Sequence, residues 1–158
     1  MQSDKWSFWD FLRYLVIAVA IVVPIRLWVG QPFIVSGASM DPTFYNGDYL
    51  IVDELSFHFR KPAKNEVIIF RYPEDPSKFF IKRIIALPGE EIKYKGNIII
   101  LGQDQYFVMG DNRDVSSDSR LWGPIDEKYV IGRAFLRLWP LQELDIIPGK
   151  DLPTKLKE

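Results

Sequence analysis

The sequence predicts a long β-strand that reads Phe79-Phe80-Ile81-Lys82-Arg83-Ile84-Ile85-Ala86-Leu87 and ends at Pro88-Gly89. Side chains alternate across a strand, so Lys82 and Arg83 face opposite sides, and one of them must point toward the more buried face. Burial lowers the pKa of an ammonium until it can be neutral near physiological pH, and a neutral lysine beside a serine is a competent general base. Taken alone, this segment is more typical of an edge strand protected by two cations.

Short β-rich runs separated by turn residues occupy the chain on both sides of this strand. A mostly antiparallel, partly closed β-structure is therefore expected after Gly30. Lys95-Gly96-Asn97 joins two of the runs into a short hairpin, and no long amphipathic helix follows the first 30 residues. His58 is interpreted as a strand or loop residue. The other predicted strands are 32–35, 49–52, 67–70, 92–94, 98–101, 106–109 and 134–139.

Near the N-terminus, the 19 residues from Phe11 to Val29 contain a nearly uninterrupted apolar run. A helix of that length extends about 28 Å, enough to cross the hydrocarbon of a bilayer. Trp6, Trp9 and Trp28 fit interfacial belts, and Arg26 can reach the interface from the far end. No small-residue cleavage site follows the run, and the run lacks the polar face of a core helix, so we predict a single uncleaved anchor.

Composition excludes several classes of function. The chain has 158 residues, room for one domain of ordinary size, and a net charge of −1, which does not indicate a nucleic-acid partner. Without cysteine there are no disulfides, thiolate nucleophiles or cysteine-rich zinc sites. With His58 as the sole histidine, neither a Ser-His-Asp triad nor a multi-histidine metal site has a strong candidate. Hydrolytic chemistry would need a different base.

A candidate nucleophile lies in the stretch Val35-Ser36-Gly37-Ala38-Ser39-Met40-Asp41-Pro42-Thr43. A glycine and a small residue precede Ser39, and a proline stiffens the chain that follows. Such a loop can present the Ser39 Oγ to a cleft while the serine's own N–H points at the same space, where an oxyanion would form. These residues alone are more typical of a solvated turn.

An acidic loop reads Gly110-Asp111-Asn112-Arg113-Asp114-Val115-Ser116-Ser117-Asp118-Ser119-Arg120 and continues to Pro124. A run this rich in Asp, Asn, Ser and Arg can be held together by carboxylate–guanidinium and hydroxyl–backbone hydrogen bonds. A solvated surface loop and a cation-binding turn are the alternatives. The spacing does not match an EF-hand, and two arginines lie among the acids.

Together these segments resemble the bacterial type I signal peptidases. The matching motifs are Ser-Met-x-Pro-Thr, Lys-Arg-Ile-Ile-x-Leu-Pro-Gly and Gly-Asp-Asn-Arg-Asp-x-Ser-x-Asp-Ser-Arg, in that order, and the resemblance covers about Pro32 to Pro140. It implies a membrane-bound serine endopeptidase with a Ser/Lys dyad that cuts signal peptides after small residues at positions −1 and −3. It also implies the β-fold of that family, with the accessory region between Glu91 and Tyr106 reduced to a hairpin.

The resemblance also assigns site residues. Ser39 matches the nucleophile and Lys82 the general base, while Ser116 matches the serine that orients the lysine. Asp118 and Arg120 match a supporting pair, and Asp111 and Arg113 match structural positions. The backbone N–H groups of Ser39 and Gly37 are the expected oxyanion donors, since Gly37 stands where some members carry a serine. No metal or organic cofactor is implied.

The expected organisation has four parts: a cytoplasmic segment (1–10), a transmembrane helix (11–29), a β-rich peptidase domain on the outer face of the plasma membrane (30–149) and a charged tail (150–158). The expected partners are the lipid bilayer and signal-peptide-bearing preproteins delivered by the secretion machinery, with no nucleic acid.

Three alternatives share some of these features. A repressor-type Ser/Lys self-cleaving protease resembles the same catalytic fold, but this chain has no N-terminal helix-turn-helix pattern. The mitochondrial inner-membrane peptidases resemble the same motifs, although Arg113 suits the bacterial group better. A non-catalytic anchored β-module that binds extended peptides would not need Ser39, Lys82 and Ser116 together.

Overall fold

A computed structural model describes residues 7–24 and 31–150 of the chain. An N-terminal helix is followed by a β-rich domain whose remaining helices are single turns. The elements are α1 (Phe8–Pro24), β1 (Gln31–Ile34), β2 (Tyr49–Asp53), α2 (Ser56–Phe59), β3 (Val67–Tyr72), β4 (Asp75–Ala86), β5 (Glu91–Tyr94), β6 (Asn97–Ile100), β7 (Gln105–Met109), α3 (Ser119–Trp122), β8 (Ile125–Asp126), η2 (Glu127–Tyr129), β9 (Val130–Trp139), η3 (Leu141–Glu143) and β10 (Asp145–Ile146).

The main sheet is antiparallel and open. Its strand order is β1-β2-β9-β3-β4-β7-β8, and β10 pairs with β9 outside this path. The prediction of a mainly antiparallel β-fold is confirmed, but the prediction of a partly closed structure is wrong. Closure requires the end strands to hydrogen-bond to each other. Within the described part of the chain, β1 pairs only with β2, and β8 is a two-residue strand that pairs only with β7.

Strand β3 is buried on both faces, which explains its uninterrupted apolar sequence. Val67 and Ile69 belong to one core cluster, with Met40, Phe44 and Leu50 among its members. Ile68 and Phe70 belong to a second cluster on the other face. Within β4, Lys82, Arg83 and Ile84 are all buried, so both faces of this part of the strand are covered, whereas residues 76–79 are exposed.

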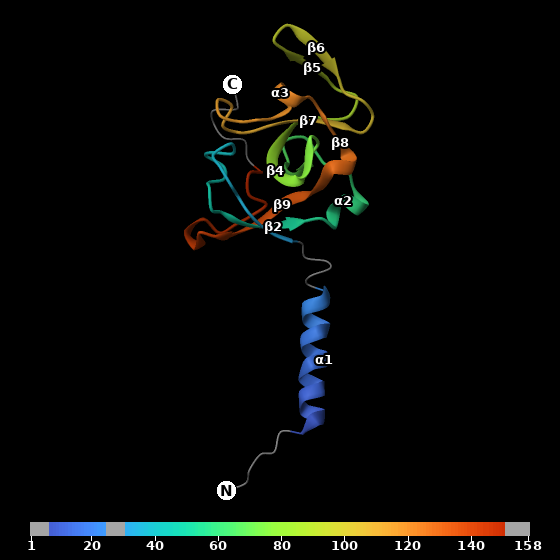
Figure 1. The fold of residues 1–158 in the computed structure, drawn as a ribbon, viewed down its shortest axis with the longest axis vertical. Helices are drawn as coiled ribbons and strands as arrows, with labels where there is room; N and C mark the ends of the chain where they lie inside the picture. Colours follow the sequence, from blue (N-terminus) through green and yellow to red (C-terminus); the bar gives the residue numbers. More distant parts are fainter. Residues whose placement is uncertain (1–6, 25–30, 151–158) are drawn as a thin grey trace.

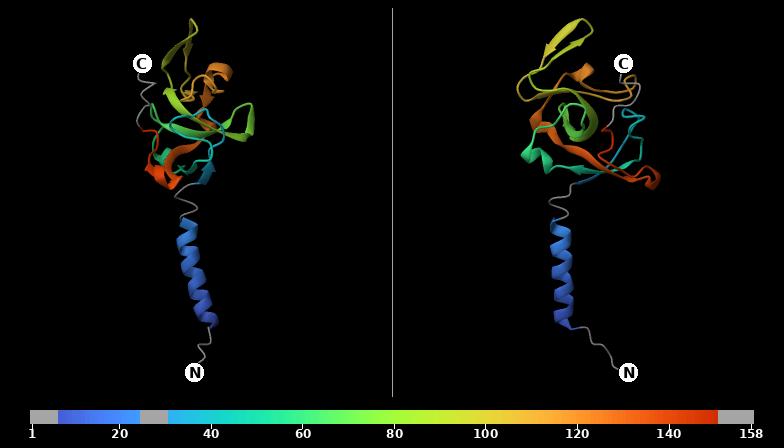
Figure 2. Two further views of the ribbon diagram at one scale, coloured as in Figure 1. Left: turned by 90° about the vertical axis from the view of Figure 1, so that its left-hand side faces the viewer. Right: turned by 180° about the vertical axis from the view of Figure 1, so that it is seen from behind.

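The described helix α1 stands apart from the β-domain, at the opposite end of the molecule from the β5–β6 hairpin (Figures 1 and 2). Within residues 7–24 and 31–150, no helix combines the length and apolar character needed to cross a membrane. The predicted span of 11–29 begins inside α1, but residues 25–29 lie outside the described residues. So do Trp6, Arg26, Trp28 and the charged tail beyond Lys150.

Two local predictions differ from the structure. Strand β4 begins at Asp75 rather than Phe79, because Tyr72 already pairs with Asp75 and a register shift accommodates Pro76, which cannot donate to the ladder. His58 lies in the single helical turn α2, not in a strand or loop, since Asp53 accepts hydrogen bonds from Ser56 at the start of that turn. The predicted hairpin is confirmed as β5–β6.

Gly132 is where β9 passes tightly between its neighbours. A Cβ there would lie 2.6 Å from the Asp53 carbonyl oxygen and 2.7 Å from Val52 Cγ1. We expect Gly132→Ala to destabilise the domain by about 2–3 kcal/mol, because overpacking against backbone cannot be relieved by a rotamer change. Urea unfolding in detergent would measure it. Gly102→Ala is the matched control, since its nearest contacts belong to the flexible Gln105 side chain; equal stability of the two variants would contradict the expectation.

Candidate active site

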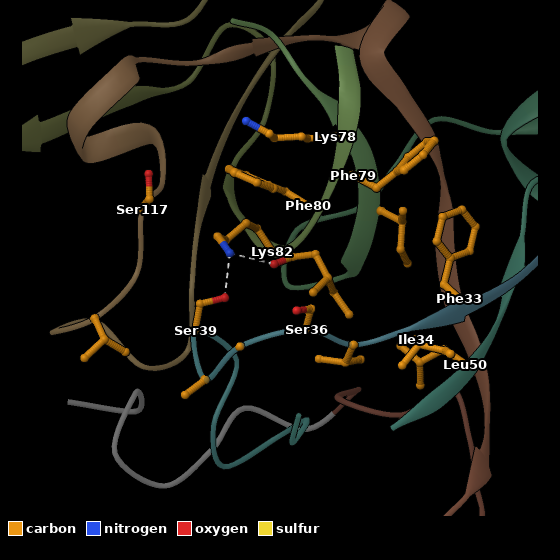
Figure 3. A pocket seen from close by; sticks show the side chains of 16 residues that line it. Phe33, Ile34, Ser36, Ser39, Leu50, Lys78, Phe79, Phe80, Lys82 and Ser117 are labelled. Carbon is orange, nitrogen blue, oxygen red and sulfur yellow. Dashed lines mark hydrogen bonds between the residues drawn. The ribbon is translucent and has the colours of Figure 1, made fainter. Parts of the chain in front are cut away.

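Strand β4 holds Lys82 against the serine loop. The lysine is 4 % exposed, and its Nζ lies 2.7 Å from Ser39 Oγ. Nζ also donates to the carbonyl oxygen of Ile81 at 2.9 Å, which fixes the direction of the side chain (Figure 3). The structure therefore brings together the two residues expected to form the dyad, 43 positions apart in sequence.

The serine loop owes its shape to core anchors on one side of Ser39. Met40 and Phe44 are buried, and the Phe44 N–H donates to the Met40 carbonyl oxygen. The Ser39 carbonyl oxygen accepts a hydrogen bond from the N–H of Asn112, so the acidic loop also fixes the position of the serine. Gly37 has a φ of +87°, a conformation that side-chain-bearing residues rarely adopt.

Burial lowers the pKa of Lys82 from its ordinary value of 10.5 to about 8. The carboxylates of Asp118 and Asp111 oppose this shift, because each favours the charged ammonium. Desolvation prevails, so about a tenth of Lys82 is neutral at pH 7, far more than for a solvated lysine. A neutral amine at this distance can accept the Ser39 hydroxyl proton.

Arg83 is fully buried as well, so Lys82 and Arg83 do not divide between a more buried and a less buried face, as the sequence suggested. The two side chains do lie on opposite faces of β4, but both faces of the strand are covered at this point. Arg83 binds the Asp111 carboxylate with Nε at 2.8 Å and Nη2 at 2.6 Å. The pairing keeps the guanidinium satisfied where water cannot reach it.

The acidic loop folds around Asp118. Its carboxylate accepts hydrogen bonds from the Gly110 N–H at 3.0 Å and from Arg120 Nε at 2.8 Å. Burial acts to raise the pKa of Asp118, but these donors hold it below its ordinary value. The Arg120 guanidinium also donates to the Arg113 carbonyl oxygen and so closes the loop. Asp118 and Arg120 thus form the ion pair that the resemblance implies.

Ser116 is buried beside the serine loop. A Cβ on Gly110 would lie 2.2 Å from Ser116 Oγ and 2.4 Å from the Ser39 carbonyl oxygen, so both atoms border Gly110. The Ser116 hydroxyl lies close enough to Asp118 to favour its charged form, although among the described residues it makes no regular hydrogen bond. In this arrangement, the described residues include no hydrogen bond between Ser116 and Lys82.

Of the two backbone N–H groups expected to bind the oxyanion, one already has a hydrogen-bond acceptor. The Gly37 N–H donates to Asn46 Oδ1 at 2.9 Å and is already engaged. Among the described residues, the Ser39 N–H has no backbone acceptor. Asn46 and Thr43 are functional neighbours that the sequence analysis missed; Thr43 Oγ1 donates to Asp111. The Ser-Met-x-Pro-Thr motif contained Thr43, but nothing in it indicated a carboxylate 68 residues away.

The dyad opens into a cleft of about 480 Å³ between the serine loop and β4. Ser39, Lys82 and Ser117 border one side of the cleft, and Phe33, Ile34 and Leu50 border the opposite side (Figure 3); Lys78 and Val115 also line it. Most of the wall between them is apolar. Its apolar lining residues are Phe33, Ile34, Val35, Leu50, Ile69, Phe79, Phe80 and Ile81.

Comparisons with known proteins identify the family. The sequence model described as "Signal peptidase, peptidase S26" matches residues 8–104 and 96–139. A serine hydroxyl beside a buried lysine, in an open apolar cleft of an antiparallel β-domain, accords with this match, and the chain is a serine peptidase. It belongs to the signal peptidase family, peptidase S26.

Similar proteins come from bacteria, mitochondria and chloroplasts. "Probable signal peptidase I-2" of Synechocystis sp. is 33 % identical over 92 % of this chain and 80 % of its own length. "Mitochondrial inner membrane protease subunit 1" of Xenopus tropicalis is 36 % identical over 80 % of this chain and 78 % of its own. A crystal structure of a signal peptidase I from Enterococcus faecalis aligns at 24 % identity and a TM-score of 0.41, covering 47 % of this chain and 97 % of that one. The family match and the signal peptidase relatives support signal-peptide cleavage as the general activity.

Burial of Lys82 should have a measurable, pH-dependent cost. Below pH 8 the native state holds a poorly solvated ammonium and the full penalty is present. Between about 8 and 10.5 the unfolded chain binds more protons, so stability rises with pH, and above 10.5 the penalty is gone. We expect Lys82→Met to stabilise the protein by up to about 3 kcal/mol at pH 6 and by much less near pH 10.

Urea unfolding of the full chain in non-ionic detergent at pH 6, 8 and 10 would measure this difference. Lys128→Met is the control, because Lys128 is exposed and its side chain pairs with Asp126 at the surface. A difference between Lys82→Met and wild type that does not change with pH would mean that Lys82 is an ordinary solvated cation.

Proposed function

We propose that this protein is a signal peptidase I that cleaves signal peptides after small residues at positions −1 and −3. Ser39 is the nucleophile and Lys82 the general base. The observation that carries this proposal is the 2.7 Å approach of Ser39 Oγ to the Nζ of a lysine that is 4 % exposed. Burial lowers the pKa of Lys82 to about 8, so the neutral amine that can accept a proton is far more populated than in a solvated lysine.

In the proposed reaction, Nζ takes the Ser39 hydroxyl proton as Oγ attacks the scissile carbonyl carbon. The lysine then gives that proton to the leaving amine, and an acyl-enzyme on Ser39 remains. A water molecule deprotonated by Lys82 hydrolyses the ester, and Ser39 recovers its proton. The Ser39 N–H is the oxyanion donor that the geometry favours; Gly37 can serve only if its hydrogen bond to Asn46 breaks.

Supporting roles are proposed for three residues of the acidic loop. Ser116 orients Lys82 from its buried position beside Gly110, by donating its hydroxyl hydrogen to the amine once the amine has lost its proton. Asp118 and Arg120 hold the loop in place through their ion pair and the Gly110 N–H. No metal or organic cofactor takes part in these steps.

An extended peptide fits the cleft by strand addition. In the part of the chain that the structure describes, β1 pairs on one side only, with β2, and residues 79–82 of β4 pair on one side only, with β3. Free strand edges on both sides can hydrogen-bond a substrate backbone, while shallow apolar pockets admit small side chains. An anchored β-module that only binds peptides would use the same edges, and the cleavage experiment below separates the two functions.

Membrane attachment is part of the proposal. From Tyr14 to Val23, α1 presents exposed apolar side chains without a charge, apart from the β-domain. We propose that this helix, continued by the residues after it, forms the single anchor of 11–29, with the N-terminus in the cytoplasm and the peptidase domain on the outer face of the plasma membrane. Preproteins emerging from the secretion machinery would meet the cleft there.

Ser39→Ala should abolish cleavage of a signal-peptide-bearing preprotein while leaving the unfolding temperature within a few degrees of wild type, because only the attacking oxygen is lost. Lys82→Ala should be similarly inactive, whereas Ser116→Ala should retain partial activity through loss of orientation alone. Gel-based cleavage by the purified full chain in detergent would rank the variants. Substantial cleavage by Ser39→Ala would exclude Ser39 as the nucleophile, and no cleavage by wild type would favour the peptide-binding module.

The topology predicts that protease added to intact spheroplasts of a bacterial host digests the domain from residue 31 onward. An N-terminal epitope tag would stay protected until lysis. Immunoblots with the tag and with an antibody to the β-domain report the two sides. Protection of the β-domain in intact spheroplasts would contradict the proposed orientation.

A further inference from the structure

The Arg83 guanidinium has a complete set of hydrogen-bond acceptors. A guanidinium carries five N–H donors. Asp111 accepts two of them, from Nε and Nη2, and the second Nη2 hydrogen points toward Thr43 Oγ1 at 3.4 Å. Nη1 donates to the carbonyl oxygens of Asn65 and Gly149. With Arg83 fully buried, loss of any acceptor would leave a charged donor unsatisfied.

One of these acceptors comes from the C-terminal segment, far from the three motifs that form the site. β10 pairs with β9, and the Ile147 N–H donates to the Phe135 carbonyl oxygen at 2.6 Å. The chain then brings the Gly149 carbonyl oxygen to Arg83, 66 residues away in sequence. The C-terminal segment thus closes the last open side of the guanidinium.

The position of residue 149 requires a glycine. Its φ is +78°, and a Cβ would lie 2.9 Å from Thr43 Cγ2, 3.0 Å from Val67 Cγ2 and 3.3 Å from Arg83 Nη2. Any other residue would therefore push either the C-terminal segment or the guanidinium out of place.

The residues around Arg83 are linked to both Ser39 and Lys82, through the chain and through one hydrogen bond. Arg83 follows Lys82 in β4, and Thr43 belongs to the loop that carries Ser39. Asp111 precedes Asn112, whose N–H donates to the Ser39 carbonyl oxygen. The carboxylates that face Lys82 are those of Asp118 and Asp111, so a shift of Asp111 also changes the charge near the base.

We propose that Gly149 is a positioning residue for the Ser39–Lys82 dyad, acting through the Arg83 guanidinium. The inference rests on the proposed function, because it is read out through peptide cleavage. It assigns the segment from Ile147 to Lys150 a role in catalysis without contact with substrate. A segment that only stabilises the fold would lower the unfolding temperature without changing the chemistry of the base.

The decisive variant is Gly149→Ala in the full chain in detergent. We expect kcat to fall at least tenfold and KM to change less than twofold, because substrate contacts are untouched. We also expect the acid limb of the kcat/KM profile to move to higher pH, because Asp111, when it is no longer held by Arg83, favours the charged form of Lys82 more strongly. Gly96→Ala is the matched control: its φ of +79° imposes the same backbone strain, but nothing lies within 4 Å of its Cβ. A chain ending at Lys150 is the second control and should keep wild-type kinetics.

A double-variant cycle tests the steric route. Thr43→Ser removes the Cγ2 that the new Cβ meets and keeps the hydroxyl that binds Asp111. Thr43→Ser with Gly149→Ala should therefore recover part of the lost kcat relative to Thr43→Ser alone. If Gly149→Ala does not fold, the same kinetics are measured for the double variant Gly149→Ala with Val67→Ala, which removes the Val67 Cγ2 that the new Cβ also meets.

The inference would be overturned if Gly149→Ala kept the kcat and the acid limb of wild type, or if Gly96→Ala changed both as much as Gly149→Ala does. Either result would leave the proposed peptidase activity intact. Failure to fold in both backgrounds would also overturn it, since Gly149 would then serve the fold as a whole. Absence of cleavage by wild type would instead refute the proposed function.

Discussion

Burial of two adjacent cations in one strand is the constraint on which the site depends. β4 places Lys82 and Arg83 on opposite faces, and both faces are covered. The two side chains meet this constraint in opposite ways. A guanidinium keeps its charge at any pH that a protein experiences, so Arg83 requires acceptors for all its donors. A lysine can give up its proton, and burial with few partners favours the neutral form of Lys82.

The need to satisfy Arg83 explains why distant segments converge behind the dyad. Its acceptors come from the serine loop, the turn before β3, the acidic loop and the C-terminal segment, through Thr43, Asn65, Asp111 and Gly149. Each of these segments also borders the core or the dyad. The free-energy cost of an unsatisfied buried donor thus ties the loops together more firmly than exposed ion pairs would. The hairpin β5–β6 forms a separate small sheet and has no part in this cluster.

The sequence predicted the parts of the fold that local patterns determine. Alternation and turn residues located most strands and the hairpin, and the resemblance identified Ser39 and Lys82. The features that the sequence analysis did not predict depend on contacts between residues far apart in the chain. Nothing near Arg83 indicated burial on its face of β4, because the covering residue Gly149 lies 66 positions away. An open or closed sheet likewise depends on whether β1 and β8 meet, which no local pattern records.

The arginines also explain how carboxylates can lie near the base without abolishing it. Asp118 and Asp111 both favour the charged form of Lys82, and an unpaired carboxylate in so poorly solvated a place would do so strongly. Each is instead bound by a guanidinium, Asp118 by Arg120 and Asp111 by Arg83. The pairing compensates much of the negative charge, so desolvation still prevails at Lys82. A peptide lying in the cleft would exclude more water and lower the pKa of Lys82 further, so the base would become most effective when substrate is bound.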